Sequence, residues 1–341
     1  MSDGKRHRTI PVFMPEMACP FRCIYCNQRV ITGQNIFLTD DEILKTIEER
    51  LATIGEDCET ELGFFGGTFT GMPLEEQERM LKIVEPYLSN EKIKSIRLST
   101  RPDYINKDVV ELLRKYGVGT VELGVQSLDD EVLRKTCRGY DSRCVYDAVD
   151  MLQRNAIEVG MQMMIGLPGD SDEKSINTAR KIIECGATNT RIYPTLVVKN
   201  TILAKMYERG EYLPLTLDEA VGITKQIMPM FEEAGVKVLR VGLHPTEGFI
   251  NGSDYLAGPF HVSFRELVET AIWKNILEKK MPKEEGNITV TVSPEMVNWA
   301  VGYHSSNKLI LEKKFKRVKY LTDARMKGRE VKISIEKPKQ R

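Results

Sequence analysis

Short apolar runs alternate along the chain with longer segments in which apolar residues recur every three or four positions. The short runs are typical of buried strands, and the longer periodic segments are typical of amphipathic helices. Six strands are expected at residues 10–14, 61–65, 95–100, 120–125, 158–165 and 189–195. Helices are expected between them at residues 40–51, 73–87, 107–116, 129–134, 144–155 and 173–185. This alternation predicts right-handed parallel βαβ units.

The pattern continues past residue 195 with a helix at 216–234 and a further strand at 237–243. Chain order leaves an open sheet and a closed barrel as alternatives, but in both the functional groups gather beyond the C-terminal ends of the strands. Glycines and polar residues stand at those ends: Gly66, Gly67, Arg101, Asp103, Gln126, Ser127, Gly166, Gly169 and Tyr193. The sequence therefore predicts a site at one mouth of the sheet.

Three cysteines, Cys19, Cys23 and Cys26, follow the first expected strand with the spacing C-x3-C-x2-C. Cysteine thiolates hold four-iron clusters, and short spacings let one loop wrap one cluster. No fourth cysteine follows nearby, so a three-cysteine loop leaves one iron open to a substrate or cofactor. A structural zinc site is the alternative, because zinc takes four Cys or His ligands; its nearest further candidates are His7 and Cys58.

The cysteine pattern, with Tyr25 before its last cysteine, resembles the signature of the radical S-adenosylmethionine (SAM) superfamily. The resemblance implies an α/β fold, a partial parallel (β/α)6 barrel, with Cys19, Cys23 and Cys26 ligating a [4Fe-4S] cluster. It also implies an enzyme whose reduced cluster splits SAM (S-adenosyl-L-methionine) into methionine and a 5′-deoxyadenosyl radical. A reducing electron donor such as ferredoxin or flavodoxin is then a partner. The radical chemistry belongs to the cofactor, which the protein positions.

The same resemblance, which runs to about residue 243, implies a set of side chains and backbone groups around SAM. They are Gly66, Gly67, Thr68, Ser99, Arg101, Gln126, Arg138 and Gln162. Two positions depart from the family pattern. Thr68 replaces a glutamate, and Ser99 replaces an acidic residue that contacts the ribose, so that Arg101 or Asp103 is expected to help there.

Within the superfamily, the segments 99–103 and 191–198 resemble the catalytic subunit of Elongator, which modifies the wobble uridine of tRNA. Oxygen-independent coproporphyrinogen oxidase is more distantly similar. The resemblance implies an RNA substrate, most plausibly tRNA. The chain is expected to lack the acetyltransferase domain of the Elongator subunit. His244 and His261 are candidates for substrate contact, with a hydrogen-bonded loop histidine as the alternative for each.

The composition shifts after residues 282–286, which predicts a core at residues 1–283 and a small α+β appendage at residues 284–341. The appendage reads as strand, helix, loop, helix and two strands. With the loop Gly302 to Ser305 between its helices, this order resembles a KH module, whose G-x-x-G loop clamps a nucleic-acid backbone. Ser305 replaces the second glycine. A plain structural cap is the alternative.

Charge and composition add the partner and the compartment. The 341 residues carry no net charge, but residues 306–341 hold 13 basic against 4 acidic side chains. Such an excess is typical of a module that faces polyanions, with a solvated charged end as the alternative. No apolar run approaches the roughly 18 residues of a membrane span, and no signal peptide is visible, which predicts a cytoplasmic protein. The scattered Cys58, Cys137, Cys144 and Cys185 are expected to be buried free thiols.

Three functions remain open at this point. The leading one is a radical SAM enzyme that acts on RNA. The second is a radical SAM enzyme that acts on a small molecule, such as a tetrapyrrole or another metabolite. The third is a non-catalytic iron–sulfur protein that binds RNA or senses redox state, which the departures at Thr68 and Ser99 favour.

Overall fold

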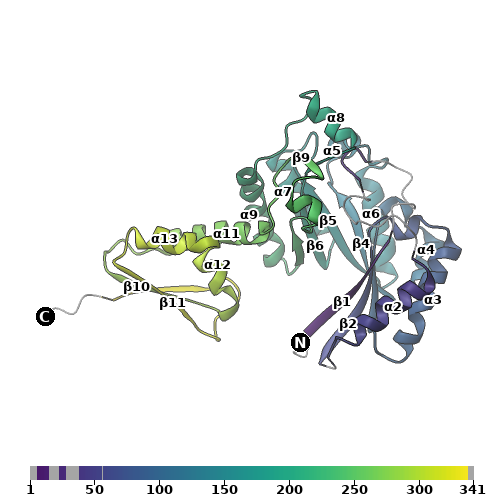
Figure 1. The fold of residues 1–341 in the computed structure, drawn as a ribbon, viewed down its shortest axis with the longest axis horizontal. Coiled ribbons are helices and arrows are strands. Elements are labelled where there is room, and N and C mark those ends of the chain that lie inside the picture. The colour runs from purple at the N-terminus through teal and green to yellow at the C-terminus, as the bar shows by residue number, and fades with distance from the viewer. Residues whose placement is uncertain (1–5, 15–22, 28–37, 56, 337–341) are drawn as a thin grey trace.

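The computed structural model describes residues 6–14, 23–27, 38–55 and 57–336. A large curled sheet covered by helices lies at one end of the molecule, and a smaller sheet with its own helices lies at the other (Figure 1). Helix α11 (Phe264–Lys280) leads from the first part to the second.

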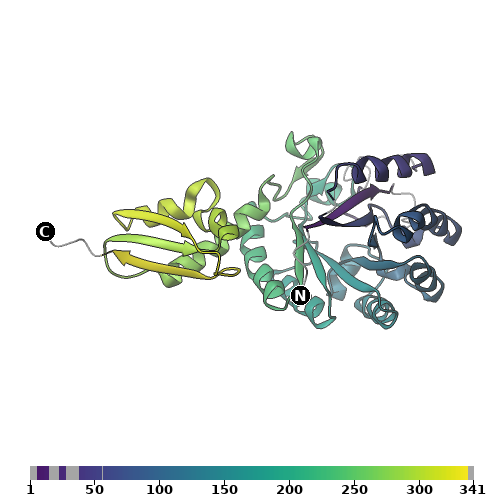
Figure 2. The ribbon, with the colours of Figure 1, turned by 90° about the horizontal axis from the view of Figure 1, so that it is seen from below.

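Seven strands form the large sheet in the order β1-β2-β3-β4-β5-β6-β8, and every neighbouring pair is parallel. The strands are β1 (Arg6–Phe13), β2 (Cys58–Phe65), β3 (Ser95–Thr100), β4 (Val118–Gln126), β5 (Glu158–Ile165), β6 (Asn189–Pro194) and β8 (Lys237–Val241). The sheet curls into a half-barrel, with the strands fanning out inside a ring of helices (Figure 2). The expected (β/α)6 barrel is confirmed, and the further strand predicted at 237–243 extends the same sheet beyond β6.

Helices cover the outside of this half-barrel. They are α2 (Asp40–Leu51), α3 (Leu74–Ser89), α4 (Lys107–Lys115), α5 (Asp130–Lys135), α6 (Ser142–Arg154), α7 (Asp172–Glu184) and α9 (Leu217–Glu233). Their starts follow from the sequence: Thr39 and Thr216 form capping boxes with the glutamates three residues later. The core lies between helices and sheet, where Leu62, Phe64 and Val121 are fully buried.

The inner face of the half-barrel is charged. Because side chains alternate across a strand, Arg97, Glu122 and Arg191 point to the inside from β3, β4 and β6. The Glu122 carboxylate accepts hydrogen bonds from Arg191 Nε (2.6 Å), Arg191 Nη2 (2.9 Å), Arg97 Nη1 (2.9 Å) and Gln162 Nε2 (3.0 Å). Arg97 Nε also donates to Glu61 at 2.7 Å. These contacts tie five strands together through one buried network.

Short elements lie over the mouth at the C-terminal ends of the strands. They are β7 (Val197–Val198), α8 (Ile202–Glu208), α10 (Glu247–Ile250) and β9 (Tyr255–Ala257), and β7 pairs antiparallel with β9. Single turns of 3-10 helix lie at Phe69–Gly71, Pro102–Tyr104, Pro294–Met296 and Tyr303–Ser305. No helix among the described ranges is long and apolar enough to cross a membrane.

The C-terminal part is a three-stranded sheet backed by helices. The sheet has the order β11-β10-β12, in which β10 (Asn287–Val292) is parallel to β11 (Arg317–Thr322) and antiparallel to β12 (Val331–Glu336). Helices α12 (Val297–Val301) and α13 (Ser306–Glu312) pack on one face, together with α11. This is the element order expected for the appendage, whereas the boundary at residue 283 and the KH likeness stay predictions.

The two parts are joined by more than a linker. Trp273 and Leu277 of α11 belong to the core of the small sheet, while Val268 and Ile272 of the same helix belong to the barrel core. Arg329, in the turn before β12, donates to Glu232 of α9 and to the buried Glu269 of α11. Helix α11 therefore serves both cores.

Candidate functional site

The cysteine loop begins directly after β1, at the C-terminal mouth of the barrel. Cys23 is buried and Cys26 is half-buried, and a turn closed by a hydrogen bond from Cys26 N to Cys23 O (3.0 Å) joins them. Cys19 lies outside the described residues, so the structure describes two of the three predicted ligands. Consistent with this, the described part of the chain contains no group of three side chains placed to hold a metal ion.

The alternative zinc ligands lie at the other end of the strands. His7 and Cys58 lie at the starts of β1 and β2. In the register of these strands Cys58 pairs with Arg6 and His7 pairs with Glu59. An eight-residue strand spans roughly 25 Å at about 3.3 Å per residue, which separates them from the loop that follows β1. The geometry contradicts a zinc site that combines this loop with His7 or Cys58.

The remaining cysteines correct a prediction. All four are free thiols, as expected, but Cys137 is exposed and Cys58, Cys144 and Cys185 are half-buried, so the expectation that they are buried was wrong. Burial raises the pKa of Cys144 to about 11, which keeps its thiol protonated at neutral pH. Cys137 and Cys144 lie in the segment that positions Arg138, on either side of Gly139.

Two guanidinium groups converge on the sulfur of Cys23. Arg138 Nη1 lies 3.1 Å from Cys23 Sγ and 3.2 Å from the Tyr25 hydroxyl, and Arg101 Nη1 lies 3.5 Å from the same sulfur. Both arginines are at least nine-tenths buried. Cationic donors stabilise a thiolate and hydrogen bonds to sulfur tune an iron–sulfur cluster. The donor set around Cys23 therefore fits an anionic, thiolate-bound cluster.

Neighbouring groups fix the two arginines. Asp103 accepts from Arg101 Nε (2.9 Å) and Nη2 (2.8 Å), and Arg101 also donates to the backbone oxygen of Arg138. Arg138 Nε donates to the Tyr140 hydroxyl at 2.9 Å, and both guanidinium groups lie over the Tyr140 ring at 5.2 and 5.0 Å. Burial raises the pKa of Tyr25 well above its usual value, so this phenol stays protonated beside Cys23.

Gln126 ends β4 with a backbone conformation that is uncommon outside glycine. Its φ is 69°, and the register of β4 and β5 shifts between Gly124 and Gln126. A Cβ atom at position 124 would lie 3.1 Å from Gln126 Nε2, so a larger residue there would displace the end of the Gln126 side chain slightly. The Oε1 atom of Gln126 is buried and has no hydrogen-bond partner among the described residues. A buried acceptor without a donor is uncommon in proteins, and an ammonium or hydroxyl group of a ligand would satisfy it.

The other predicted SAM contacts fall into two places. Gly66 and Gly67 turn the chain after β2 with φ values of 85° and 38°, a sharp turn that favours glycine, and Thr68 behind them is buried. Ser99 and Gln162 lie together on the inner face, where Gln162 Nε2 approaches Ser99 Oγ at 3.4 Å. The structure thus places Arg101 and Arg138 at Cys23, and the Gln126 side chain beside Gly124, to which Arg138 also extends, whereas Ser99 and Gln162 lie near Glu122 on the inner face.

Sequence reasoning missed Tyr140 and the network around Glu122. A signal for the network was present, because Arg97, Glu122 and Arg191 interrupt apolar strands at inward positions. Tyr140 had no comparable signal, since its role depends on the fold of the loop after α5.

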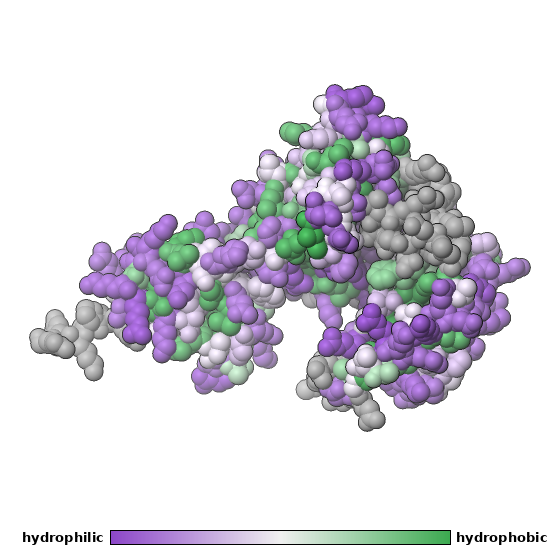
Figure 3. Space-filling view, viewed as in Figure 1, coloured by the Kyte–Doolittle hydropathy of each residue, from purple (hydrophilic) through white to green (hydrophobic). Residues whose placement is uncertain are grey.

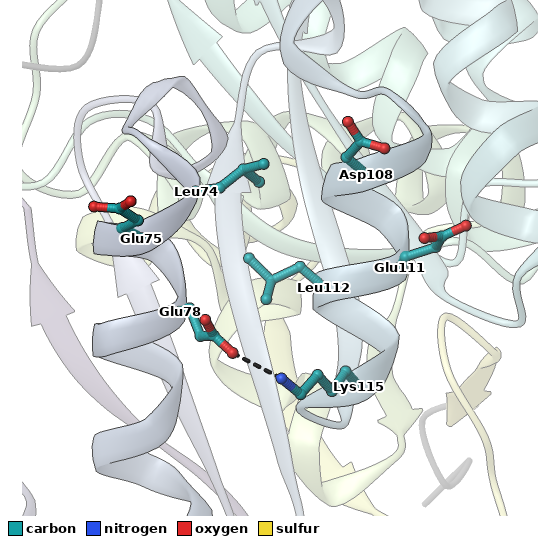
Figure 4. A pocket seen from close by; sticks show the side chains of 7 residues that line it. All are labelled: Leu74, Glu75, Glu78, Asp108, Glu111, Leu112 and Lys115. Atoms are coloured by element: carbon teal, nitrogen blue, oxygen red, sulfur yellow. Dashed lines mark hydrogen bonds and ion pairs between the residues drawn. The ribbon is translucent and has the colours of Figure 1, made fainter.

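One further pocket lies away from this mouth. Its volume is about 330 Å³, and it lies on the outer surface between α3 and α4 (Figure 4). Leu74 and Leu112 form its floor, and Glu78 accepts a hydrogen bond from Lys115 at 2.7 Å. The face of the molecule shown in Figure 3 is otherwise a mixture of hydrophilic and small apolar areas. This pocket has no contact with the cysteine loop.

A parallel half-barrel with a cysteine loop and arginines at its C-terminal mouth defines an α/β enzyme that places a bound cluster and a cofactor over the strand ends. The family model described as the radical SAM superfamily matches residues 17–182, and the model of the radical SAM C-terminal domain matches residues 188–274. The chain belongs to the radical SAM superfamily. Enzymes of this superfamily use a [4Fe-4S] cluster and SAM.

Two curated relatives each match more than half of this chain. A protein named tRNA uridine(34) acetyltransferase from Dehalococcoides mccartyi is 28% identical over 270 residues, which cover 68% of this chain and 58% of the relative. Elongator complex protein 3 of Saccharomyces cerevisiae is 28% identical over 203 residues, which cover 53% of this chain and 36% of the relative. The chain therefore spans between about a third and three fifths of these two curated relatives.

A solved structure confirms the fold. The archaeal Methanocaldococcus infernus Elp3 with an N-terminal deletion superposes with a TM-score of 0.64 at 22% sequence identity. The match covers 81% of this chain and 63% of that chain. The predicted likeness to the Elongator catalytic subunit is confirmed at the level of family and fold.

Proposed function

We propose that the chain is a radical SAM enzyme that acts on tRNA or another RNA. The observation that carries the proposal is the mouth itself, where Arg101 and Arg138 converge on Cys23 beside the unsatisfied Gln126. Relatives named tRNA uridine(34) acetyltransferase and Elongator complex protein 3 support the RNA substrate. Cys19, Cys23 and Cys26 would hold a cluster that, once reduced, would supply the electron for cleavage of SAM to a 5′-deoxyadenosyl radical.

The chain's own residues would bind and orient these groups. Cys23 and Cys26, with Cys19, would hold the cluster. Gln126 would accept a hydrogen bond from SAM, and Arg138 would hold both the cysteine loop and the end of β4 through the Gly124 carbonyl. Gly66, Gly67 and Thr68 would offer backbone groups after β2, with Ser99, Arg101 and Gln162 on the inner side. An electron donor such as ferredoxin or flavodoxin would reduce the cluster in the cytoplasm.

The C-terminal part would bind the RNA backbone. Its sheet carries helices on one face, while the other face is left open (Figure 2). Arg317, Lys319 and Lys332 are exposed and stand on this open face among the hydroxyl side chains of β10. The open face has no aromatic side chain on which bases could stack, so it favours phosphate contacts over base readout.

The Gly302–Ser305 loop has a second candidate role in this binding. Gly302 has a φ of 87°, and Tyr303 N donates to Thr270 of α11 at 2.8 Å. Tyr303 also lies edge-on to the His261 ring at 5.5 Å. Half of the loop is thus used to pack against the barrel side, while His304 and Ser305 remain exposed. The open sheet face is therefore the stronger candidate for the main RNA contact.

The deciding experiment is anaerobic reconstitution with iron, sulfide, SAM, a reductant and total tRNA. We expect 5′-deoxyadenosine together with a modified nucleoside that mass spectrometry detects. The matched control is Cys23→Ala, which should yield neither product. Cleavage of SAM without any change in RNA nucleosides would favour a small-molecule substrate, and absence of cleavage in cluster-loaded protein would favour a non-catalytic iron–sulfur protein.

A further inference from the structure

An arginine without a counterion stands at the open edge of the half-barrel. Arg240 lies on β8, the last strand of the sheet, and is the register partner of Arg191 on β6. Both side chains therefore lie on the inner face. The inner carboxylates are already engaged, because Glu122 binds Arg191 and Arg97, and Glu61 binds Arg97. Arg240 makes no ion pair with any carboxylate of the described ranges.

The groups that Arg240 does contact orient it without neutralising it. Its Nε donates to Gly242 O at 3.1 Å, and its Nη2 donates to Leu243 O at 3.3 Å. Nη2 also lies 3.2 Å from His244 Nδ1. Because Nδ1 faces a guanidinium donor, it accepts, and the hydrogen of the neutral ring stands on Nε2. No contact from Nη1 to another described residue is found, so two N–H donors remain for a ligand.

The electrostatics favour an anion at this place. A half-buried guanidinium beside a second one is costly unless an opposite charge compensates it. Burial lowers the pKa of Arg240, and the neighbouring Arg191 lowers it further, whereas Tyr193 opposes the change. Burial and the charge of Arg240 likewise lower the pKa of His244, so His244 is neutral at neutral pH. The two N–H groups of Nη1 can donate charge-assisted hydrogen bonds to phosphate oxygens.

We propose that Arg240 and His244 form a phosphate-binding subsite at the mouth of the barrel, which holds a phosphodiester of the RNA substrate next to the reacting nucleotide. This inference rests on the proposed function, because it takes the substrate to be RNA. The subsite lies on β8 and the turn after it, across the mouth from Cys23 and Arg138, which follow β1 and β4. The proposed function assigns SAM to the side of the mouth where Arg101 and Arg138 contact Cys23, so the anion for the Arg240 side is a phosphate of the substrate.

The test is a binding cycle between protein and RNA variants. The full chain, loaded with its cluster, is titrated with an oligouridylate and with versions that carry one neutral methylphosphonate linkage each. In the wild-type protein, neutralising one particular linkage should weaken binding about tenfold, the usual scale of one charged hydrogen-bond pair. In Arg240→Gln the same linkage should no longer matter, while the other linkages keep their effects.

Two controls keep the result specific. Arg154→Gln removes an equal charge from the outer helix α6, where Arg154 pairs with Asp150 at 2.8 Å and is 76% exposed. It should leave the whole linkage pattern unchanged. Arg240→Lys keeps the charge but loses the backbone hydrogen bonds that orient the guanidinium group, so it should recover part of the linkage effect. Iron content of each variant shows that the holoprotein has formed.

The outcomes distinguish failure of the phosphate subsite from failure of the proposed RNA substrate. A uniform loss across all linkages in Arg240→Gln would show that Arg240 acts only on the structure of β8 and would overturn the subsite. Wild-type binding with identical patterns in Arg240→Gln would overturn the subsite and leave RNA as the substrate. Failure of the wild-type protein to bind any of these RNAs at low salt would overturn both the subsite and the proposed function.

Discussion

Replacing Glu122 by glutamine should destabilise the barrel more than a change of one oxygen suggests. The carboxylate is 1% exposed and receives four donors, of which three come from guanidinium groups. Glutamine offers one acceptor atom and turns an amide donor toward Arg97 or Arg191. The variant then buries two guanidinium groups with only Glu61 to balance them. Breaking a buried ion pair by removing one partner costs about 3–5 kcal/mol.

Urea unfolding of the anaerobic protein, followed by circular dichroism, measures this cost. With a slope of roughly 3 kcal/mol per molar urea or more for a chain of this size, the midpoint should fall by about 1 M at constant slope. The surface control is Glu111→Gln, whose partner Lys107 lies one helical turn away and whose side chain is 65% exposed. That change should stay within about 0.5 kcal/mol.

A double variant and a pH series test the cause. In Glu122→Gln with Arg191→Gln, the buried charge is balanced again, so the loss should be smaller than the sum of the single losses. Burial raises the pKa of Glu122, but hydrogen bonds and charge from Arg191 and Arg97 outweigh burial and hold it below 4.5. Its contribution is therefore complete above pH 4.5 and is lost as the pH falls through the lowered value. A midpoint equal to that of the surface control, or strict additivity, would refute the reasoning.

Four further outcomes are expected. Cys23→Ala should lose the roughly four irons per chain of the wild type, and retained iron measured by colorimetric assay would contradict the ligand assignment. Gln126→Leu should weaken SAM binding about tenfold in calorimetry yet leave the urea midpoint equal or higher, because it removes an unsatisfied acceptor; unchanged SAM affinity would exclude this contact. Arg138→Gln should reduce both iron retention and SAM affinity, and loss of SAM affinity alone would separate it from Cys23. Arg329→Met should increase hydrogen exchange in β12 and α11, since it removes the hydrogen bond to the buried Glu269 and leaves that carboxylate only the longer ion pair with Arg265 at 3.8 Å; unchanged exchange would show that apolar packing alone joins the two parts.

The strands and helices could be predicted from the sequence because each helix buries one apolar face and each strand is a continuous apolar run. Six apolar runs predicted the strands up to residue 195. Because the strands of βαβ units are parallel, their C-terminal ends were expected at the same mouth of the sheet. A seventh strand was also expected at residues 237–243, but its position beside β6 comes from the structure.

Other features depend on contacts between residues that are distant in the chain. Arg101 and Arg138 converge on Cys23 because two loops meet above β3 and β4, which no local pattern encodes. Strands β7 and β9 have two and three residues, too few for a periodicity to appear. The parallel pairing of β10 with β11 likewise depends on how α12 and α13 cross the small sheet. The charged residues of the inner face can be seen in the sequence. An apolar run, however, indicates only that a strand is buried, and it does not show which face of the sheet carries the charged side chains.

Because α11 gives side chains to both cores and Arg329 fastens the turn before β12 to α9 and α11, the small sheet is mounted on the barrel as a fixed arm. A polymer bound to the open sheet face would reach the barrel mouth only at a fixed distance along its chain from the bound segment. If the substrate is RNA, as proposed, this arm would select it by the distance between the segment bound at the small sheet and the nucleotide at the barrel mouth, whatever the base sequence between them.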